Sequence, residues 1–263
     1  NWVAAVCVNL LRFPGWGRAQ ETYGEDPVHV GAMGAAITRG LQRRTVACVK
    51  HLALNAIDHT RFVVDVQISS RALHELYLPQ FRACVEAGAG SVMSAYNRMN
   101  GEWCGQHPQL LQQILKQRWG FEGVVVSDFI FGIRDGVKAL QAGQDLEMPF
   151  RMVWEGCIEE ALDDARLPQQ RLDDAVRRQL RLQLAVPPGD EPSAVRSCPA
   201  HRRLARQAAT ESIVLLRNQA GELPWRDLQS LAVIGELAHK PNLGDHGSSD
   251  TRPQPGQITT PLE

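Results

Sequence analysis

The feature that most constrains the fold of this chain is a run of three valines, Val124 to Val126, with Asp128 following two residues later. Consecutive β-branched side chains without a polar partner predict a strand that is buried on both faces, as in a parallel sheet covered by helices. Asp128 then follows the carboxyl end of that strand, which is the edge where α/β folds place their chemistry. Two interpretations of this carboxylate are open: it caps the following helix, or it is a catalytic group.

An alternation of strand and helix extends through residues 1–185. The pattern predicts strands at 1–9, 45–51, 90–97 and 124–126, and helices at 28–43, 69–86, 107–119, 133–141, 152–166 and 168–185, the last with Leu172, Val176 and Leu180 on one stripe. This order indicates an α/β fold, either a (β/α) barrel or a doubly wound sheet. With residues 144–149, which follow the helix at 133–141, we count about five strands, so a full eight-stranded barrel would require sequence upstream of Asn1.

The chain is predicted to hold two domains. Residues 1–185 would form the C-terminal part of a (β/α) barrel, and the proline-rich residues 186–200 would be a linker. Residues 201–263 would begin a second α/β domain, with a helix at 201–212 and short buried strands at 213–216 and 231–235. Because the chain starts within a strand and stops at a helix start, we expect an internal piece of a longer protein.

Composition excludes several classes of function. With 263 residues, a net charge of −1 and a pI near 6.8, the chain lacks the charge balance of a nucleic-acid or anionic-membrane binder. No apolar run reaches the roughly 18 residues that span a bilayer. The six cysteines lack metal-site spacing, so we expect no zinc site and no cofactor, and a reduced compartment is the simpler interpretation. Because we expect the N-terminus of the protein to lie upstream of Asn1, cytoplasmic, periplasmic and secreted locations all stay open. The sequence does not indicate an oligomeric state.

Polar side chains follow each predicted strand, and in a barrel they converge on one face. They are Arg18, Lys50, His51, Tyr96, Asn97, Asp128 and Asp145, with the aromatic residues Trp16, Tyr23, Trp103 and Phe129 nearby. Flat aromatic rings can pack on the C–H faces of a sugar, and charged side chains beside them can form hydrogen bonds with its hydroxyl groups. This combination suits a polyhydroxylated ring such as a sugar.

Each of these residues also has a structural interpretation. Lys50 and His51 could clamp a phosphate or carboxylate, or pair with an acid. Tyr96 could be a core tyrosine, and Arg18 could hold its own loop through Glu21 or Glu25. A phosphate loop is not indicated, because Gly15-Trp16-Gly17 lacks the Lys-Ser pattern that would have to follow.

Six ordered blocks of sequence resemble glycoside hydrolase family 3, which contains β-glucosidases and other exo-glycosidases. They are PGWGRAQETYGEDP (14–27), KHLALN (50–55), VDVQISSRALHELYLPQF (64–81), SVMSAYNRMNG (91–101), GFEGVVVSDF (120–129) and AGQDLEMP (142–149). ESIVLLRN (211–218) and LAVIG (231–235) extend the resemblance beyond the linker. It implies a partial TIM-type barrel followed by an α/β sandwich domain, with the active site at their interface.

The resemblance implies a retaining, exo-acting glycosidase that removes β-linked glucose or a similar sugar from the non-reducing end of oligosaccharides or glucosides. Asp128 would be the nucleophile. Arg18, Lys50, His51 and Tyr96 would contact the sugar, and the cations Lys50 and Arg18 would favour the ionised form of Asp128. The partner would be a carbohydrate substrate, with no nucleic acid and no membrane.

Two departures from the family pattern qualify this expectation. Many members carry Trp where this chain has Phe129, so Phe129 and Trp16 are only candidates for an aromatic subsite. KHLALN lacks the His-bearing loop of the N-acetylhexosaminidase branch, which favours the glucosidase-like branch. The acid/base Glu and an early sugar-binding Asp would lie outside the chain, so we expect the isolated chain to be at best feebly active.

Three other interpretations remain open. The protein could be a β-xylosidase or arabinofuranosidase of the same family, or an inactive sugar-binding fragment. It could also be an aldolase-type barrel in which Lys50 forms a Schiff base.

Overall fold

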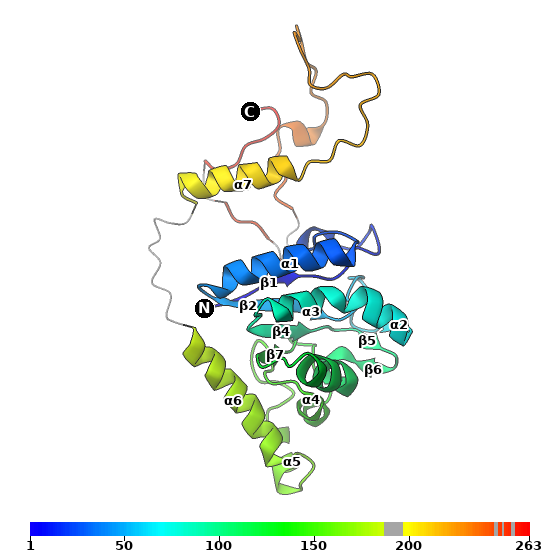
Figure 1. The fold of residues 1–263 in the computed structure, drawn as a ribbon, viewed down its shortest axis with the longest axis vertical. Coiled ribbons are helices and arrows are strands. Elements are labelled where there is room, and N and C mark those ends of the chain that lie inside the picture. Colours follow the sequence, from blue (N-terminus) through cyan, green and yellow to red (C-terminus); the bar gives the residue numbers. More distant parts are fainter. Residues whose placement is uncertain (187–196, 245–246, 249, 254–255) are drawn as a thin grey trace. The chain divides into compact units, whose positions relative to one another are not determined.

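A computed structural model describes residues 1–186, 197–244, 247–248, 250–253 and 256–263 (Figure 1). It divides into two compact units, residues 1–188 with 245–250, and residues 189–244 with 251–263. Most of the predicted linker at 186–200 lies outside the described residues. No helix in the described part of the chain has the length and apolar character that crossing a bilayer requires.

The first unit is built on a parallel sheet of four strands, β1 (Trp2–Cys7), β2 (Val46–Leu52), β4 (Ser91–Ser94) and β7 (Val124–Val126). Their order in the sheet, β1-β2-β4-β7, follows their order in the chain (Figure 1). Leu146 adds an isolated parallel bridge to Val126, at the position of a fifth strand. The predicted strands of this half are therefore confirmed.

The three valines of β7 pack on both faces of the sheet. Val125 belongs to the cluster beneath the covering helices, with Phe81 and Leu111. Val124 and Val126 belong to a separate cluster on the opposite face, with Met93. Because side chains alternate along a strand, a run without polar residues serves both clusters. This confirms the two-sided burial that the sequence predicts.

The helices of the first unit lie mainly where the periodicity places them. They are α1 (Pro27–Gln42), α2 (Ser70–Ala72), the π turn η2 (Leu73–Tyr77), α3 (Pro79–Glu86), the π-type helix η4 (Gln109–Arg118), α4 (Gly136–Ala142), α5 (Cys157–Asp163) and α6 (Gln169–Ala185). Helix α1 starts because Asp26 accepts hydrogen bonds from the N–H groups of Val28 and His29. It packs closely on its neighbours: a Cβ at Gly34 would lie 2.6 Å from Val8 and 2.8 Å from Cys84.

Helix α5 is shorter than predicted, since residues 152–156 are not helical. The buried carboxylate of Glu147 accepts the backbone N–H groups of Met152, Val153 and Trp154 at 2.8–3.0 Å. These N–H groups are thereby held in a loop instead of an α-helical turn. The helix starts only at Cys157.

Short strands that the sequence did not reveal lie beside the main sheet. β3 (Asp65–Val66) pairs in parallel with β5 (Arg98–Met99), which pairs antiparallel with β6 (Glu102–Trp103). A strand of two residues is too short to show an alternation of apolar and polar side chains, so the sequence pattern does not predict it.

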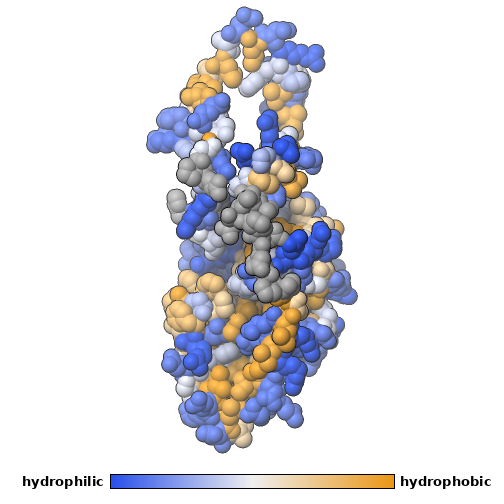
Figure 2. Space-filling view, turned by 90° about the vertical axis from the view of Figure 1, so that its left-hand side faces the viewer, coloured by the Kyte–Doolittle hydropathy of each residue, from blue (hydrophilic) through white to orange (hydrophobic). Residues whose placement is uncertain are grey.

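Helix α6 presents its apolar stripe outward. Val176, Leu180 and Leu184 are 45%, 53% and 86% exposed, whereas Ala175 faces the core. Figure 2 shows a band of apolar side chains on the side of the molecule where this helix lies. The stripe predicted from the spacing is present, but in this structure it is not the buried face.

The second unit contains helix α7 (Pro199–Glu211) and the short η6 (Glu236–Ala238). The predicted strands at 213–216 and 231–235 are wrong for this structure, because those residues have no strand conformation. Ile213, Leu216 and Ile234 are 77%, 93% and 92% exposed. A strand forms only when a neighbouring strand takes up its backbone N–H and C=O groups, and the described residues of this unit supply none.

Candidate active site

Asp128 lies in the turn that leaves β7 and is only 6% exposed. Its Oδ1 accepts the N–H of Phe129 at 2.9 Å, and its Oδ2 has no hydrogen-bond partner among the described residues. Helix α4 begins only at Gly136 and is capped by Asp135, so the interpretation of Asp128 as a helix cap is wrong. A buried carboxylate oxygen without a partner is costly, which is typical of a reactive site.

Glu21 joins two of the predicted sugar contacts. Its carboxylate takes a two-pronged hydrogen bond from Arg18, at 2.5 and 2.9 Å, and lies 2.9 Å from Nζ of Lys50. Burial by itself would raise the pKa of Glu21, but the hydrogen bond from Arg18 and the charge of Lys50 hold it below its ordinary value. The arginine therefore does tie down its own loop, while also facing the site.

His51 connects Arg18 to the carboxylate. Its Nε2 lies 2.9 Å from a terminal nitrogen of Arg18 and 3.7 Å from Oδ2 of Asp128. Its backbone and Nδ1 contact the side chain of Asn9, at the end of β1. Burial, followed by the charges of Arg18, Lys50 and Arg61, lowers the pKa of His51 well below its usual value, so the imidazole is neutral.

Tyr96 lies at the same edge of the sheet, after β4. Its hydroxyl donates to the carbonyl of Phe129 at 2.7 Å. Burial and the charge of Asp128 raise the pKa of Tyr96, so it stays a neutral donor. Arg61 stacks 5.1 Å from the centre of this ring and is paired with Asp58 at 2.6 Å.

Sequence reasoning missed Arg61 and Asn9. The only available signal for Arg61 was its place in a long loop after β2, and for Asn9 its place at the end of a strand. Glu21 was considered only as a partner of Arg18, so its contact with Lys50 was also missed.

The aromatic candidates differ in exposure. Trp16 is 2% exposed, whereas Phe129 is 40% exposed. Phe131 extends this apolar rim, with its ring 5.4 Å from that of Phe62, which in turn contacts Tyr96 at 4.7 Å. A role for Trp16 or Phe129 in an aromatic subsite stays a prediction.

Arg18 favours the ionised form of Asp128, as expected, but burial of the carboxyl group has the larger effect on its pKa. Burial raises the pKa of Asp128 above its ordinary value of 3.8, although the Phe129 N–H and the charge of Arg18 act in the opposite direction. The ammonium group of Lys50 is matched instead by Glu21. Desolvation of the carboxylate therefore outweighs the neighbouring cations.

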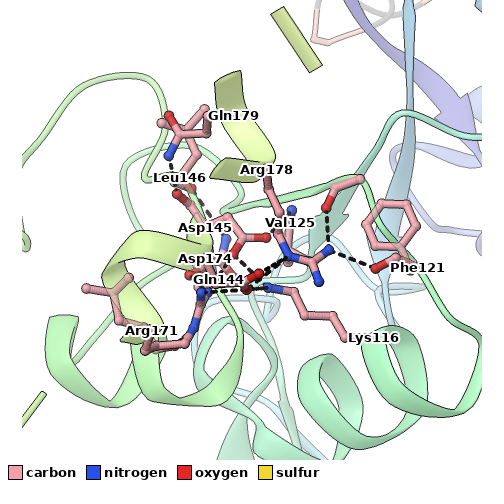
Figure 3. Close-up of polar contacts among 12 residues, drawn as sticks. Lys116, Phe121, Val125, Gln144, Asp145, Leu146, Arg171, Asp174, Arg178 and Gln179 are labelled. Carbon is pink, nitrogen blue, oxygen red and sulfur yellow. Dashed lines mark hydrogen bonds and ion pairs between the residues drawn. The ribbon is translucent and has the colours of Figure 1, made fainter. Parts of the chain in front are cut away.

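Asp145 does not join this site. It is fully buried, and its Oδ1 binds Nζ of Lys116 at 2.6 Å and Arg171 at 2.5 Å, while Oδ2 accepts the N–H of Val125 (Figure 3). Arg171 comes from α6, so the cluster fastens that helix to the sheet. The prediction that Asp145 converges with the other strand-end residues is wrong, because its carboxylate is paired with Lys116 and Arg171 instead.

Asn97 is also structural. Its Nδ2 donates to the carbonyl of Ala53 at 3.2 Å, which ties the end of β4 to the loop after β2. Among the described residues no group of three His, Cys, Asp or Glu side chains could hold a metal ion.

Comparison with known proteins defines the class. Residues 1–182 match the glycosyl hydrolase family 3 N terminal domain, and the chain belongs to this family. The resemblance drawn from the six sequence blocks and the TIM-type α/β fold of the first unit are thereby confirmed.

The most similar relatives include several proteins named β-glucosidases. The chain is 38% identical over 248 residues to thermostable beta-glucosidase B of Acetivibrio thermocellus, covering 93% of this chain and 33% of that protein. Probable beta-glucosidase I of Aspergillus flavus is 35% identical over 235 residues, covering 87% and 28%. The chain thus spans about a third of the length of these relatives.

Solved structures give the same class. Beta-glucosidase 3B from Thermotoga neapolitana in complex with α-D-glucose superposes with a TM-score of 0.89 at 35% identity, covering 97% of this chain and 37% of that one. The β-glucosidase of Kluyveromyces marxianus in complex with glucose gives 0.85 at 30% identity, covering 93% and 31%.

Proposed function

We propose that this chain belongs to a retaining β-glucosidase in which Asp128 is the nucleophile. The observation that carries the proposal is the buried Oδ2 of Asp128, which has no hydrogen-bond partner among the described residues. Arg18, His51 and Tyr96 lie around this carboxylate. The β-glucosidase names of the relatives support glucose as the sugar.

In this mechanism Oδ2 of Asp128 attacks the anomeric carbon, and the bond to the leaving-group oxygen breaks as that oxygen receives a proton. The resemblance to the family assigns that proton to a Glu beyond this chain. Water then attacks the anomeric carbon and gives a proton to the same Glu, while the bond from that carbon to Asp128 breaks and leaves the sugar and a free carboxylate. The raised pKa of Asp128 requires that the pH be high enough to ionise it.

The charged groups around Asp128 suit the sugar hydroxyls. Arg18 and Lys50 are held rigidly by Glu21, so they need not reorganise when the substrate arrives. Their donors, together with that of Tyr96, can bind the hydroxyl groups and hold the anomeric carbon in line with Asp128. The exposed Phe129 offers an apolar face at the rim.

Mechanism-based labelling tests this proposal. The full-length protein that contains this chain is incubated with an activated 2-deoxy-2-fluoro-β-glucoside and digested, and the adduct is mapped by mass spectrometry. We expect an adduct on Asp128 and none in Asp128→Asn. Sugar binding without an adduct would instead support the inactive sugar-binding alternative.

The same experiment separates the remaining alternatives. Faster labelling by the corresponding xyloside or arabinofuranoside would assign the protein to those activities. Trapping of Lys50 by borohydride with a carbonyl substrate would support the aldolase interpretation. The ion pair between Lys50 and Glu21 argues against it, because a Schiff base requires a free neutral amine. Robust aryl-β-glucoside hydrolysis by the isolated chain would contradict the expectation that the chain alone is feebly active.

A further inference from the structure

Asn9 makes three polar contacts with one residue, His51, across the β1–β2 pair. Its Nδ2 donates to the carbonyl of His51 at 2.9 Å, and its Oδ1 accepts the backbone N–H of His51 at 2.8 Å. The same Oδ1 lies 3.1 Å from the ring atom Nδ1. Both residues are nearly inaccessible, at 3% and 1% exposure, so water does not compete for these groups.

The backbone of His51 determines which way the Asn9 amide points. A backbone N–H can only donate and a carbonyl can only accept, so Oδ1 must face the N–H and Nδ2 the carbonyl. Oδ1, which has no proton, is therefore the atom beside ring Nδ1. A hydrogen bond between these two atoms requires the proton to be on Nδ1 of His51.

The other ring nitrogen then has to be unprotonated. Nε2 faces a guanidinium nitrogen of Arg18 at 2.9 Å, and a guanidinium can only donate. A proton on Nε2 would set two donors against each other. Arg18, Lys50, Arg61 and Asp128 are the charged groups acting near this ring, and the three cations disfavour an imidazolium.

This protonation state has a consequence for Asp128. Its Oδ2 lies 3.7 Å from Nε2, and since Nε2 carries no proton, His51 cannot donate to it. Oδ2 is the oxygen that has no hydrogen-bond partner in the described part of the chain. A hydrogen bond from His51 would stabilise the carboxylate and reduce its reactivity as a nucleophile.

We propose that Asn9 is a positioning residue: it fixes His51 as the neutral tautomer protonated on Nδ1, and so keeps Oδ2 of Asp128 free to attack the sugar. The proposal rests on the function proposed above, because it assigns Asn9 a role in the reactivity of that nucleophile. Thr22 supports the arrangement by donating to the carbonyl of Asn9, which joins the Arg18 loop to the end of β1.

The test combines two variants of Asn9 with one matched control. Asn9→Leu removes the acceptor beside Nδ1, so that Arg18 alone still opposes a proton on Nε2. Asn9→Asp keeps the acceptor and nearly the same shape, but adds a negative charge that favours an imidazolium. Asn100→Asp is the control, because Asn100 bridges the backbone N–H and carbonyl of Ile68 in the same two-pronged way without touching a histidine.

The first readout is the ring-nitrogen chemical shifts of His51 in protein labelled with ¹⁵N-histidine. His51→Gln identifies its signals among those of the eight histidines. We expect a protonated Nδ1 and a bare Nε2 in the parent protein and in Asn100→Asp. A larger population with a protonated Nε2 is expected in both Asn9 variants, and unchanged ring-nitrogen shifts in both would overturn the proposal. A protonated Nε2 in the parent would overturn the proposal.

The second readout is the rate at which the 2-fluoro-glucoside labels Asp128. We expect both Asn9 variants to label on the order of 10–100-fold more slowly, the range found when a metal-ligating histidine loses the partner that orients it. Asn100→Asp should label at the parent rate. In a His51→Gln background, Asn9→Leu should have no further effect beyond twofold.

The outcomes separate the two proposals. Absence of label in the parent, with the histidine signals as expected, would overturn the function proposed for Asp128. Normal labelling of Asn9→Leu with its histidine proton moved to Nε2 would overturn the role of Asn9 alone. If Asn9→Leu does not fold, Asn9→Asp decides the result, since it preserves the volume of the side chain.

Discussion

Oε2 of Glu21 lies 2.9 Å from Nζ of Lys50, while both oxygens of the same carboxylate bind Arg18. One acid thus neutralises two cations whose side chains are 6–7% exposed. Because buried charges are stable only when paired, the geometry of the site depends on a residue that need not touch the sugar.

Replacing Glu21 with Gln should therefore destabilise the fold. The change leaves two buried cations without a counter-charge, and loss of one member of a buried ion pair costs about 3–5 kcal/mol. Urea unfolding of the two proteins measures the difference in free energy of unfolding. Glu25→Gln, an exposed acid of the same loop, is the control and should change this free energy by less than about 0.5 kcal/mol. Equal effects of the two substitutions would contradict the assignment.

The reaction of Asp128 should have an acidic limit above pH 3.8. Burial raises the pKa of this carboxyl, and only its ionised form attacks the sugar. The rate of labelling by the 2-fluoro-glucoside should fall as the pH drops through that raised pKa. Arg18→Met should move the limit to still higher pH, because the guanidinium favours the carboxylate. A labelling rate that stays constant down to pH 3.8 would exclude the raised pKa.

Folding stability should decrease as the pH falls below 6.5. The pKa of His51 is lowered in the folded chain, so below pH 6.5 the unfolded state binds a proton that the folded state does not. His107, whose pKa is also lowered by burial, contributes with the same sign. Each such proton gives a slope of up to about 1.4 kcal/mol per pH unit.

Urea unfolding between pH 7 and 5 measures this slope. His51→Gln should reduce it, since the variant no longer has this group to protonate in the unfolded state. The exposed His29 provides the control, and His29→Gln should leave the slope unchanged. A His51→Gln slope equal to that of the parent would show that His51 binds its proton as readily in the folded protein as in the unfolded chain, and would exclude the lowered pKa.

Asp145→Asn should destabilise the chain without removing a contact to the sugar. The substitution leaves Lys116 and Arg171 without their shared buried carboxylate, for an expected loss of about 3–5 kcal/mol. Asp173→Asn, an exposed acid on α6, should have little effect on unfolding. Under conditions where Asp145→Asn is folded, its Asp128 should be labelled by the 2-fluoro-glucoside at a rate within about threefold of the parent. A selective loss of labelling would return Asp145 to the active site.

Much of the first unit could be predicted because its pattern is local. The spacing of apolar residues revealed the four main strands and most of the helices, and the three valines revealed burial on both faces of β7. The position of Asp128 after β7 follows directly from that strand. Helix α5 was predicted too long, because the acceptor that holds its first N–H groups, Glu147, lies outside the helical pattern.

The sequence by itself determined the α/β alternation, the family resemblance and the candidate residues at the strand ends. The tertiary structure decided which of these residues meet. Asn9 reaches His51 across 42 positions because β1 and β2 pair in parallel, and Asp145 meets Lys116, which lies 29 positions away in the chain. Protonation and pairing depend on such distant neighbours and on exclusion of water, which no local spacing records.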